Sequence, residues 1–380
     1  MALKSQKHLF SIDEDVVYFN IASFSPAFKS VEEAGIKAIN KKSQPQLIKS
    51  ADLFEPVVEL RKLFAKIIDE DDVNRVVTVP SVSYGLATVA NNITLKKDDE
   101  IIIVEEQFPS NYYVWEALAI KFDAKIITIK QPEHIDNWNQ HILNHINPKT
   151  ALVAIGQIHW ANGFIFDLKA IRVKTKAVNA LLIIDGSQSI GALPFSIKNI
   201  QPDALVCAGY KWLFGPYGCA YAYYGDYFDN GEPIEYSWVN RKNSEYLSGL
   251  TSYQSDYKPK AHRYAMGQSG SFIYVKMQIE ALKEVIKISA SELQDYCYQI
   301  SESWLEKLHE LGFESDAPHI RAKHLFGIKI PSKINAEDLK SHLEKHNIYV
   351  SIRGNYMRLS CHIFNTESDF EKLYNTLKSL

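Results

Sequence analysis

The chain has 380 residues, enough for two domains, and its 46% hydrophobic and 23% charged residues are typical of a globular protein. Its 42 basic and 45 acidic residues give a net charge of −3, which offers no electrostatic case for nucleic acid as a partner. No segment reaches the roughly 18 apolar residues of a membrane span, and the N-terminus lacks the apolar stretch of a signal peptide, so we expect no membrane contact.

The four cysteines are scattered in apolar surroundings and form no Cys-x-x-Cys pair: Cys207, Cys219, Cys297 and Cys361. This pattern predicts buried thiols, with neither a disulfide framework nor a metal site. A reducing, cytoplasmic location is therefore expected.

The first two thirds of the chain alternate short apolar runs with helical patterns. Most of the runs are β-branched and show no alternation, as in strands buried on both faces. The expected strands are residues 75–78, 100–104, 124–129, 151–155, 181–185, 204–208 and 219–224, with helices at 84–92, 111–122 and 168–180. Repeated strand–helix–strand order predicts an α/β fold, with a mostly parallel, seven-stranded sheet flanked by helices.

The pattern changes after residue 225. The expected elements are long loops to residue 259, a long helical stretch from 271 to about 311, a strand at 324–330, a helix at 336–346 capped by Asn335, short strands around Tyr349 and Met357, and a last helix from Glu367. These elements predict a smaller α+β domain. We place a large, cofactor-binding domain at residues 18–260 and a small domain at residues 1–17 plus 261–380.

Polar and aromatic residues follow the carboxyl ends of the strands, where open α/β sheets bind their ligands. Ser81-Val82-Ser83 opens a helix, which suits an anion such as phosphate, although a plain serine N-cap explains the same residues. Asp185 ends an apolar strand and needs a partner, which could be a cationic ligand nitrogen, a metal or a backbone cap. We therefore expect one concave site at this edge.

Lys211 lies in the segment GYKWLFGPYG, among glycines and aromatic residues. Burial there would disfavour its ammonium form and suit Schiff-base chemistry, unless the side chain extends past Trp212 into solvent. An anion site, a buried aspartate, the aromatic plate of Phe108 and a carbonyl-reactive lysine match the phosphate, ring nitrogen, ring face and aldehyde of pyridoxal 5'-phosphate (PLP).

Five segments, in order, resemble motifs of the class V aminotransferases among the fold-type I PLP enzymes: YFNIASFSP, EEQFPSN, DGSQSIG, GYKWLFGPYG and MRLSCHIFNTESD. The resemblance covers nearly the whole chain and is closest to the branch with isopenicillin N epimerase-like proteins and cysteine desulfurases. It implies the PLP-transferase fold of type I, an amino-acid or amine substrate, and a homodimer with sites at the subunit interface.

The resemblance also implies roles for single residues. Lys211 would hold the cofactor as a Schiff base and shuttle the Cα proton, with Asp185 at the ring nitrogen. The residues implied to bind the cofactor phosphate are Val82, Ser83, Tyr210 and, from the partner subunit, Gln268. Phe108 would stack on the cofactor ring, and Gln188 and Asn162 would hydrogen-bond its phenolic oxygen. The implied substrate contacts are Arg358, which matches the arginine that binds the α-carboxylate, together with Arg353 and Ala22.

Two departures bear on the reaction. Ala208 stands where many relatives have a phosphate-binding serine, and no loop between Arg353 and Arg358 could carry the nucleophilic cysteine of a desulfurase; Cys361 is more simply a core residue. We therefore expect an aminotransferase, which needs no further residue. An amino-acid epimerase, a cysteine desulfurase or C–S lyase, and a non-catalytic ligand-binding protein of the same fold remain alternatives.

Overall fold

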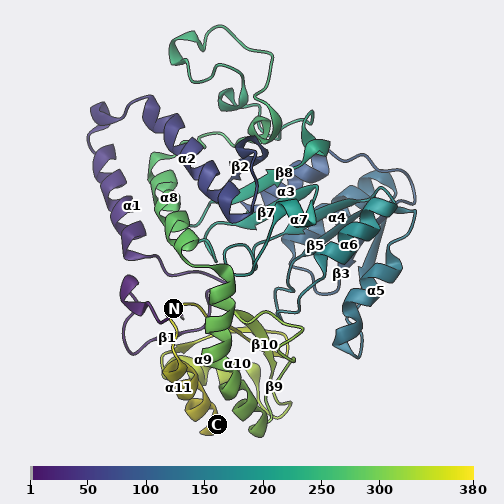
Figure 1. Cartoon of the computed structure of the whole chain (residues 1–380), viewed down its shortest axis with the longest axis vertical. Helices are drawn as coiled ribbons and strands as arrows, with labels where there is room; N and C mark the ends of the chain where they lie inside the picture. The colour runs from purple at the N-terminus through teal and green to yellow at the C-terminus, as the bar shows by residue number, and fades with distance from the viewer. Residues whose placement is uncertain (1–2) are drawn as a thin grey trace.

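The computed structural model describes residues 3–380, and Figure 1 shows a central sheet layered with helices and a second unit that contains the C-terminus. Within the described residues the central sheet has seven strands in the order β2-β8-β7-β6-β5-β3-β4. They are β2 (Val76–Val79), β3 (Glu100–Val104), β4 (Lys125–Ile129), β5 (Thr150–Gly156), β6 (Leu181–Asp185), β7 (Ala204–Ala208) and β8 (Ala220–Tyr224). Only β8 runs antiparallel to its neighbours among these strands, so the predicted mostly parallel sheet is confirmed.

Both faces of this sheet are buried, which explains the missing alternation in the sequence. In β3, Ile101 and Ile103 belong to one apolar cluster, and Ile102 and Val104 belong to the other. The first cluster includes side chains of α3 (Val82–Asn91) and α4 (Ser110–Phe122). The second cluster includes side chains of three helices: α2 (Ala51–Ile67), α5 (Trp138–His145) and α6 (Leu168–Ala177). Helix α7 (Ile197–Ile200) is a single short turn.

The helical stretch expected between residues 271 and 311 is two helices, α8 (Phe272–Lys287) and α9 (Ala290–Glu310). The predicted helical stretch is present, but the prediction did not include the break within it. Ile288 and Ser289 have extended backbone angles, and the Ser289 side chain accepts a hydrogen bond from the N–H of Glu292 as the N-cap of α9. Helix α8 packs against α2 and against α1 (Lys29–Lys42), two helices that were not among the expected elements.

The C-terminal unit is a small antiparallel sheet with helices. The sheet order is β12-β13-β10-β9, formed by β9 (Glu314–Ser315), β10 (Leu325–Lys329), β12 (Ser351–Arg353) and β13 (Tyr356–Ser360), with α10 (Ala336–Lys345) and α11 (Glu367–Lys378). Near the N-terminus, β1 (Val17–Tyr18) pairs in parallel with β11 (Ile348–Tyr349). Asn335 caps α10 as predicted. The division of the chain at residue 260 stays a prediction.

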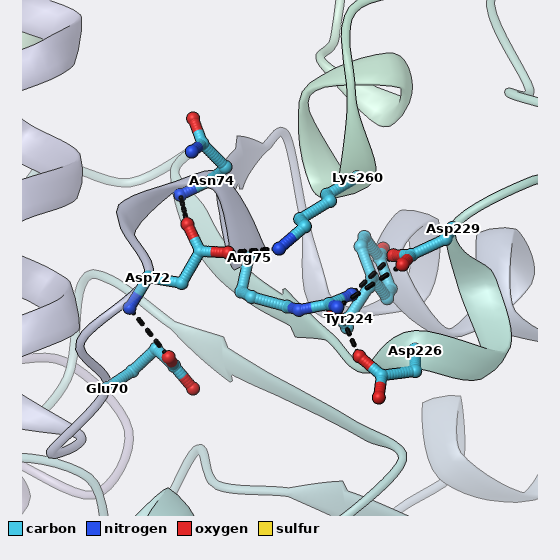
Figure 2. A network of polar contacts seen from close by, with 8 residues as sticks. All are labelled: Glu70, Asp72, Asn74, Arg75, Tyr224, Asp226, Asp229 and Lys260. Atoms are coloured by element: carbon cyan, nitrogen blue, oxygen red, sulfur yellow. Dashed lines mark hydrogen bonds and ion pairs between the residues drawn. The ribbon is translucent and has the colours of Figure 1, made fainter.

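Residues 225–259 contain 3₁₀ turns and no α-helix or strand, as expected, and a polar network anchors both ends of this segment (Figure 2). Arg75, which immediately precedes edge strand β2, binds the carboxylates of Asp226 and Asp229. Lys260 binds the carboxylate of Asp72. In residues 3–380, no helix is both long enough and apolar enough to span a bilayer.

Candidate active site

A cavity of about 240 Å³ lies at the carboxyl ends of the parallel strands. It is lined by seven of the predicted catalytic and cofactor-binding residues: Val82, Ser83, Phe108, Asp185, Gln188, Tyr210 and Lys211. A larger cavity of about 710 Å³ lies elsewhere, between α2 and residues 238–273. We take the smaller cavity as the candidate site because it alone of the two contains the buried lysine and aspartate.

The N-terminus of α3 forms one end of this cavity. Its first N–H groups have no acceptor within the helix and carry the positive end of the helix dipole, so they suit an anion. The Ser81 hydroxyl accepts from the N–H of Tyr84 at 3.1 Å, and the Ser83 hydroxyl donates to that of Ser110 at 2.9 Å. Gly85 lets α3 approach the sheet, because a Cβ there would lie 2.6 Å from the Val206 side chain in β7.

Asp185 is the last residue of β6, and its side chain faces the cavity. One carboxylate oxygen accepts from the N–H of Ser187 at 2.9 Å. Burial raises the pKa of this carboxyl, while hydrogen bonds from Ser187 and the nearby charge of Lys211 oppose the rise. A cationic N–H placed in the cavity would stabilise the carboxylate that burial disfavours.

Lys211 follows β7 on a tight turn, in which the N–H of Gly215 donates to the carbonyl of Gly209 at 2.8 Å. Its side chain is only 7% exposed, and its Nζ atom lies 5.4 Å from the centre of the Phe108 ring. Burial lowers the pKa of the amine from 10.5 to about 8; Asp185 opposes this shift. The prediction of a buried lysine is therefore confirmed, and a neutral amine is accessible near pH 8.

The amide of Gln188 borders the cavity and is held from two sides. Its Nε2 atom donates to the carbonyl of Ala22 at 3.0 Å, and its Oε1 atom accepts from the Trp212 indole N–H at 2.8 Å. Ala22, predicted as a substrate contact, therefore reaches the site through its carbonyl bond to Gln188.

Asn162 is not among the residues that line this cavity, so its predicted contact with the cofactor stays a prediction. Its side chain completes the turn that contains it: Oδ1 accepts from the N–H of Phe164 at 3.0 Å and contacts a ring nitrogen of His159 at 3.1 Å, and Nδ2 donates to Gln131. The same turn instead directs Trp160 to the cavity wall, where its ring meets the Phe108 ring edge to face at 5.4 Å.

Arg358, on β13, is 2% exposed, and the hydrogen bonds of its guanidinium to the described residues go to neutral groups. It donates to the carbonyl of Trp160 at 3.0 Å and to the hydroxyls of Ser23 at 2.8 Å and Ser351 at 3.3 Å, while its Nε lacks a partner. Burial and the neighbouring charge of Arg353 lower its pKa to about 9. A buried guanidinium without a carboxylate partner suits an anionic ligand.

Arg353 and Arg358 share Trp160 as a neighbour, since their guanidinium carbons lie 5.6 and 5.7 Å from the centre of its ring. Neither arginine is among the residues that line the Lys211 cavity, but both lie close enough for their charges to lower the pKa of Lys211. Ser23 and Ser351, which hold Arg358, were not among the predicted site residues, although Ser23 lies within the segment YFNIASFSP.

Gln268 does not line the Lys211 cavity of its own chain. It lines the larger cavity, beside α2, with a left-handed backbone at φ 60°.

All four cysteines are free and buried, as predicted. Cys219 is the one that lines the Lys211 cavity, and burial raises its pKa to about 12. Its sulfur accepts from the amide of Gln278 at 3.1 Å. Cys361 lies fully buried near the carbonyl of Lys323. Residues 3–380 contain no group of three His, Cys, Asp or Glu side chains suited to a metal ion.

Comparisons with known proteins show which curated proteins this chain resembles. An uncharacterized aminotransferase, YcbU of Bacillus subtilis, is 26% identical over 310 residues, covering 81% of this chain and 80% of the relative. The hercynylcysteine sulfoxide lyase of Schizosaccharomyces pombe is 24% identical over 98% of this chain and 96% of the relative. Isopenicillin N epimerase of Streptomyces clavuligerus is 19% identical over 97% and 96%.

Solved structures show the same fold. The apo cysteine desulfurase of Thermococcus onnurineus NA1 superposes with a TM-score of 0.83 at 20% identity, over the full length of both chains. The cystine C–S lyase C-DES, in complex with cysteine persulfide, gives a TM-score of 0.84 at 19% identity over 96% and 97% of the two chains. The predicted fold-type I architecture is confirmed.

The sequence profile of aminotransferase class-V matches residues 47–373, most of the chain. With the lysine, aspartate and helix N-terminus in one cavity, this match confirms the predicted PLP-dependent enzyme. The chain belongs to the class V aminotransferase family.

Proposed function

We propose that this PLP-dependent enzyme transfers the amino group of an α-amino acid, with Lys211 as its catalytic base. The observation that carries the proposal is the buried Lys211 amine, whose pKa burial lowers to about 8, in the same cavity as Asp185. An amine with this pKa is partly neutral near physiological pH and can accept a proton at Nζ.

The residues of the cavity fit the cofactor. The N–H of Val82, the hydroxyl of Ser83 and Tyr210 would hold the phosphate, Phe108 would cover the ring, and Asp185 would bind the ring N–H. When bound, PLP condenses its aldehyde with an amine and withdraws electrons from the carbon that bears the amine. Gln188 would donate to the phenolic oxygen. The contact of Asn162 with the phenolic oxygen stays a prediction, because its side chain is not among those that line the cavity.

Lys211 and Arg358 would act on the bound substrate. The Arg358 guanidinium would bind the substrate carboxylate, an anion that supplies the partner its buried charge lacks. We keep Arg353 as a second carboxylate contact, since it lies against the same Trp160 ring. Lys211 Nζ would take the proton from Cα and deliver it on the same face to the carbon that was the cofactor's aldehyde, so that the amino group would stay with the cofactor.

The side chains around the cavity favour transamination over two alternatives. Epimerisation needs a second acid–base group on the opposite face of Cα. Lys211 is the one amine among the described lining residues, and burial raises the pKa of two other lining groups, Tyr210 and Cys219, which makes them poor bases near neutral pH. A desulfurase needs a reactive thiolate, whereas burial raises the pKa of Cys219 to about 12, and Cys361 lies in the core.

A C–S lyase is the second candidate, because elimination uses the same single base and the sulfoxide lyase of S. pombe aligns over 98% of this chain. Purified holoenzyme supplied with single amino acids and a 2-oxo acid acceptor separates the two. We expect one new amino acid for each 2-oxo acid formed from the donor, and no product from a Lys211→Ala control. Release of ammonia and a sulfur product without a new amino acid would establish the lyase instead.

We also propose a homodimer in which Gln268 approaches the phosphate site of the partner subunit. Its place in the larger cavity, away from the Lys211 site of its own chain, supports this arrangement. Sedimentation of the Gln268→Ala variant tests the oligomeric state, and its affinity for PLP tests the contact. We expect a dimer that binds PLP more weakly than the wild type; a monomer would contradict the proposed dimer. The four free thiols support our proposal of a cytoplasmic location.

A further inference from the structure

The orientation of the Gln188 amide is determined by its neighbours. An indole N–H can only donate, so the atom that faces Trp212 at 2.8 Å must be the amide oxygen. The amide nitrogen then points away from Trp212, and one of its two N–H groups donates to the carbonyl of Ala22. The second N–H is left for the cavity that Gln188 lines with Lys211.

The backbone of Gln188 is held by His324, which immediately precedes β10 in the C-terminal unit. The His324 Nε2 atom lies 2.8 Å from the Gln188 carbonyl, and Nδ1 lies 2.7 Å from the amide nitrogen of Gln294. The carbonyl must accept and the amide must donate, so Nε2 carries the proton. Burial lowers the pKa of His324 to about 4, which keeps the ring neutral.

Trp212 and His324 also contact each other, and both are fully buried. Their rings meet edge to face at 4.5 Å, and the His362 ring packs against Trp212 at 6.2 Å. The His362 ring is also buried, which lowers its pKa to about 3, so no charged imidazole faces this group near neutral pH. The amide of Gln294 further binds the carbonyl of Ala192, on the segment that carries Gln188.

We propose that Trp212 and His324 are positioning residues, which hold Gln188 so that its second amide N–H faces the cavity beside Lys211 and donates to an oxygen of the bound cofactor. Trp212 sets which end of the amide faces the cavity, and His324 fixes the backbone from which the amide extends. The inference rests on the proposed function, because the acceptor is the phenolic oxygen of PLP.

The test measures the pH dependence of the visible absorbance of the holoenzyme, without substrate. A donor to the phenolic oxygen stabilises its anion, so loss of the donor should raise the midpoint of the titration. We expect Gln188→Ala to raise the midpoint by about one pH unit, and Trp212→Phe, which removes the indole N–H, by roughly half a unit to one unit. In the double variant the Trp212 change should add nothing.

Trp115→Phe is the matched control. Trp115 is also fully buried and donates its indole N–H to a side-chain amide, that of Asn111 at 2.8 Å, but it lies on α4 and does not line the cavity. It should lower the melting temperature without moving the midpoint. An unshifted midpoint in Trp212→Phe, or an equal shift that persists in the Gln188→Ala background, would overturn the inference.

His324 gives an independent arm that does not depend on the folding of Trp212→Phe. His324→Gln can keep a donor near the position of Nε2 and should retain the wild-type midpoint, whereas His324→Leu should raise it; equal midpoints in the two variants would overturn the role of His324. The visible absorbance band of the wild-type holoenzyme is expected whether or not Trp212 and His324 position Gln188. Its absence would contradict the proposed function and this inference together, while a band without shifts contradicts this inference alone.

Discussion

The Nζ atom of Lys211 lies 5.4 Å from the centre of the Phe108 ring, and the two residues come from turns that follow β7 and β3. Two non-adjacent strands of the parallel sheet thus bring an amine and an aromatic face together over one cavity. The aromatic neighbour and the buried surroundings exclude water from the amine, which is why its pKa falls to about 8.

Asp185→Asn should lower kcat by about 10²- to 10³-fold, corresponding to roughly 3–4 kcal/mol, because an amide cannot balance a protonated ring nitrogen. The amide oxygen can still accept from the N–H of Ser187, so the fold and cofactor content should be retained. Steady-state kinetics at saturating PLP measures the effect. Turnover within threefold of wild type would mean that Asp185 is only a structural cap.

Arg358→Lys should raise KM for α-amino acids by about tenfold to a hundredfold, because a point charge cannot replace the planar guanidinium fork. Primary amines without a carboxylate provide the control, and their KM should change little. If both classes of substrate respond equally, Arg358 supports the site through its bonds to Trp160 and Ser23 and does not bind the carboxylate.

Lys211→Met should stabilise the cofactor-free protein at neutral pH. Burial lowers the pKa of Lys211 from 10.5 in the unfolded chain to about 8, so below pH 8 the folded protein must hold a buried ammonium at a cost of about 3 kcal/mol. As pH rises from 8 to 10.5 the unfolded chain also loses its proton, and the cost disappears. Chemical denaturation of both proteins across this range should show their difference shrinking. A pH-independent difference would contradict the lowered pKa.

Arg75→Met should lower the free energy of unfolding by about 1 kcal/mol, because it leaves the part-buried carboxylate of Asp229 without its partner, whereas the exposed Asp226 stays solvated (Figure 2). Arg75→Lys should recover only part, since one ammonium cannot replace a guanidinium fork that spans two carboxylates. Urea denaturation measures both variants. Activity of the folded fraction should be unchanged, because none of these residues lines the Lys211 cavity; a large loss of activity would show that the network supports the site.

The sheet was readable from sequence because its strands are short apolar runs buried on both faces. Three observed strands, Glu100–Val104, Leu181–Asp185 and Ala204–Ala208, begin and end at the predicted residues. The break at Ile288 was missed because the apolar helical pattern continues through it, and only the backbone turn makes Ser289 a cap.

The candidate site was readable where its residues directly follow strands. Asp185 and Lys211 were placed correctly, since the carboxyl ends of the parallel strands meet at one edge. Asn162 lies six residues beyond the end of β5, and local hydrogen bonds within its turn decide where its side chain points. The support of Arg358 by Ser23 joins residues 335 positions apart, which no local pattern reveals.

Borohydride reduction of the yellow holoenzyme, followed by proteolysis and mass spectrometry, tests the central claim most directly. A pyridoxyl adduct on Lys211, in the peptide that contains GYKWLFGPYG, is the predicted result. An unmodified Lys211, or an adduct confined to other lysines, would contradict the account.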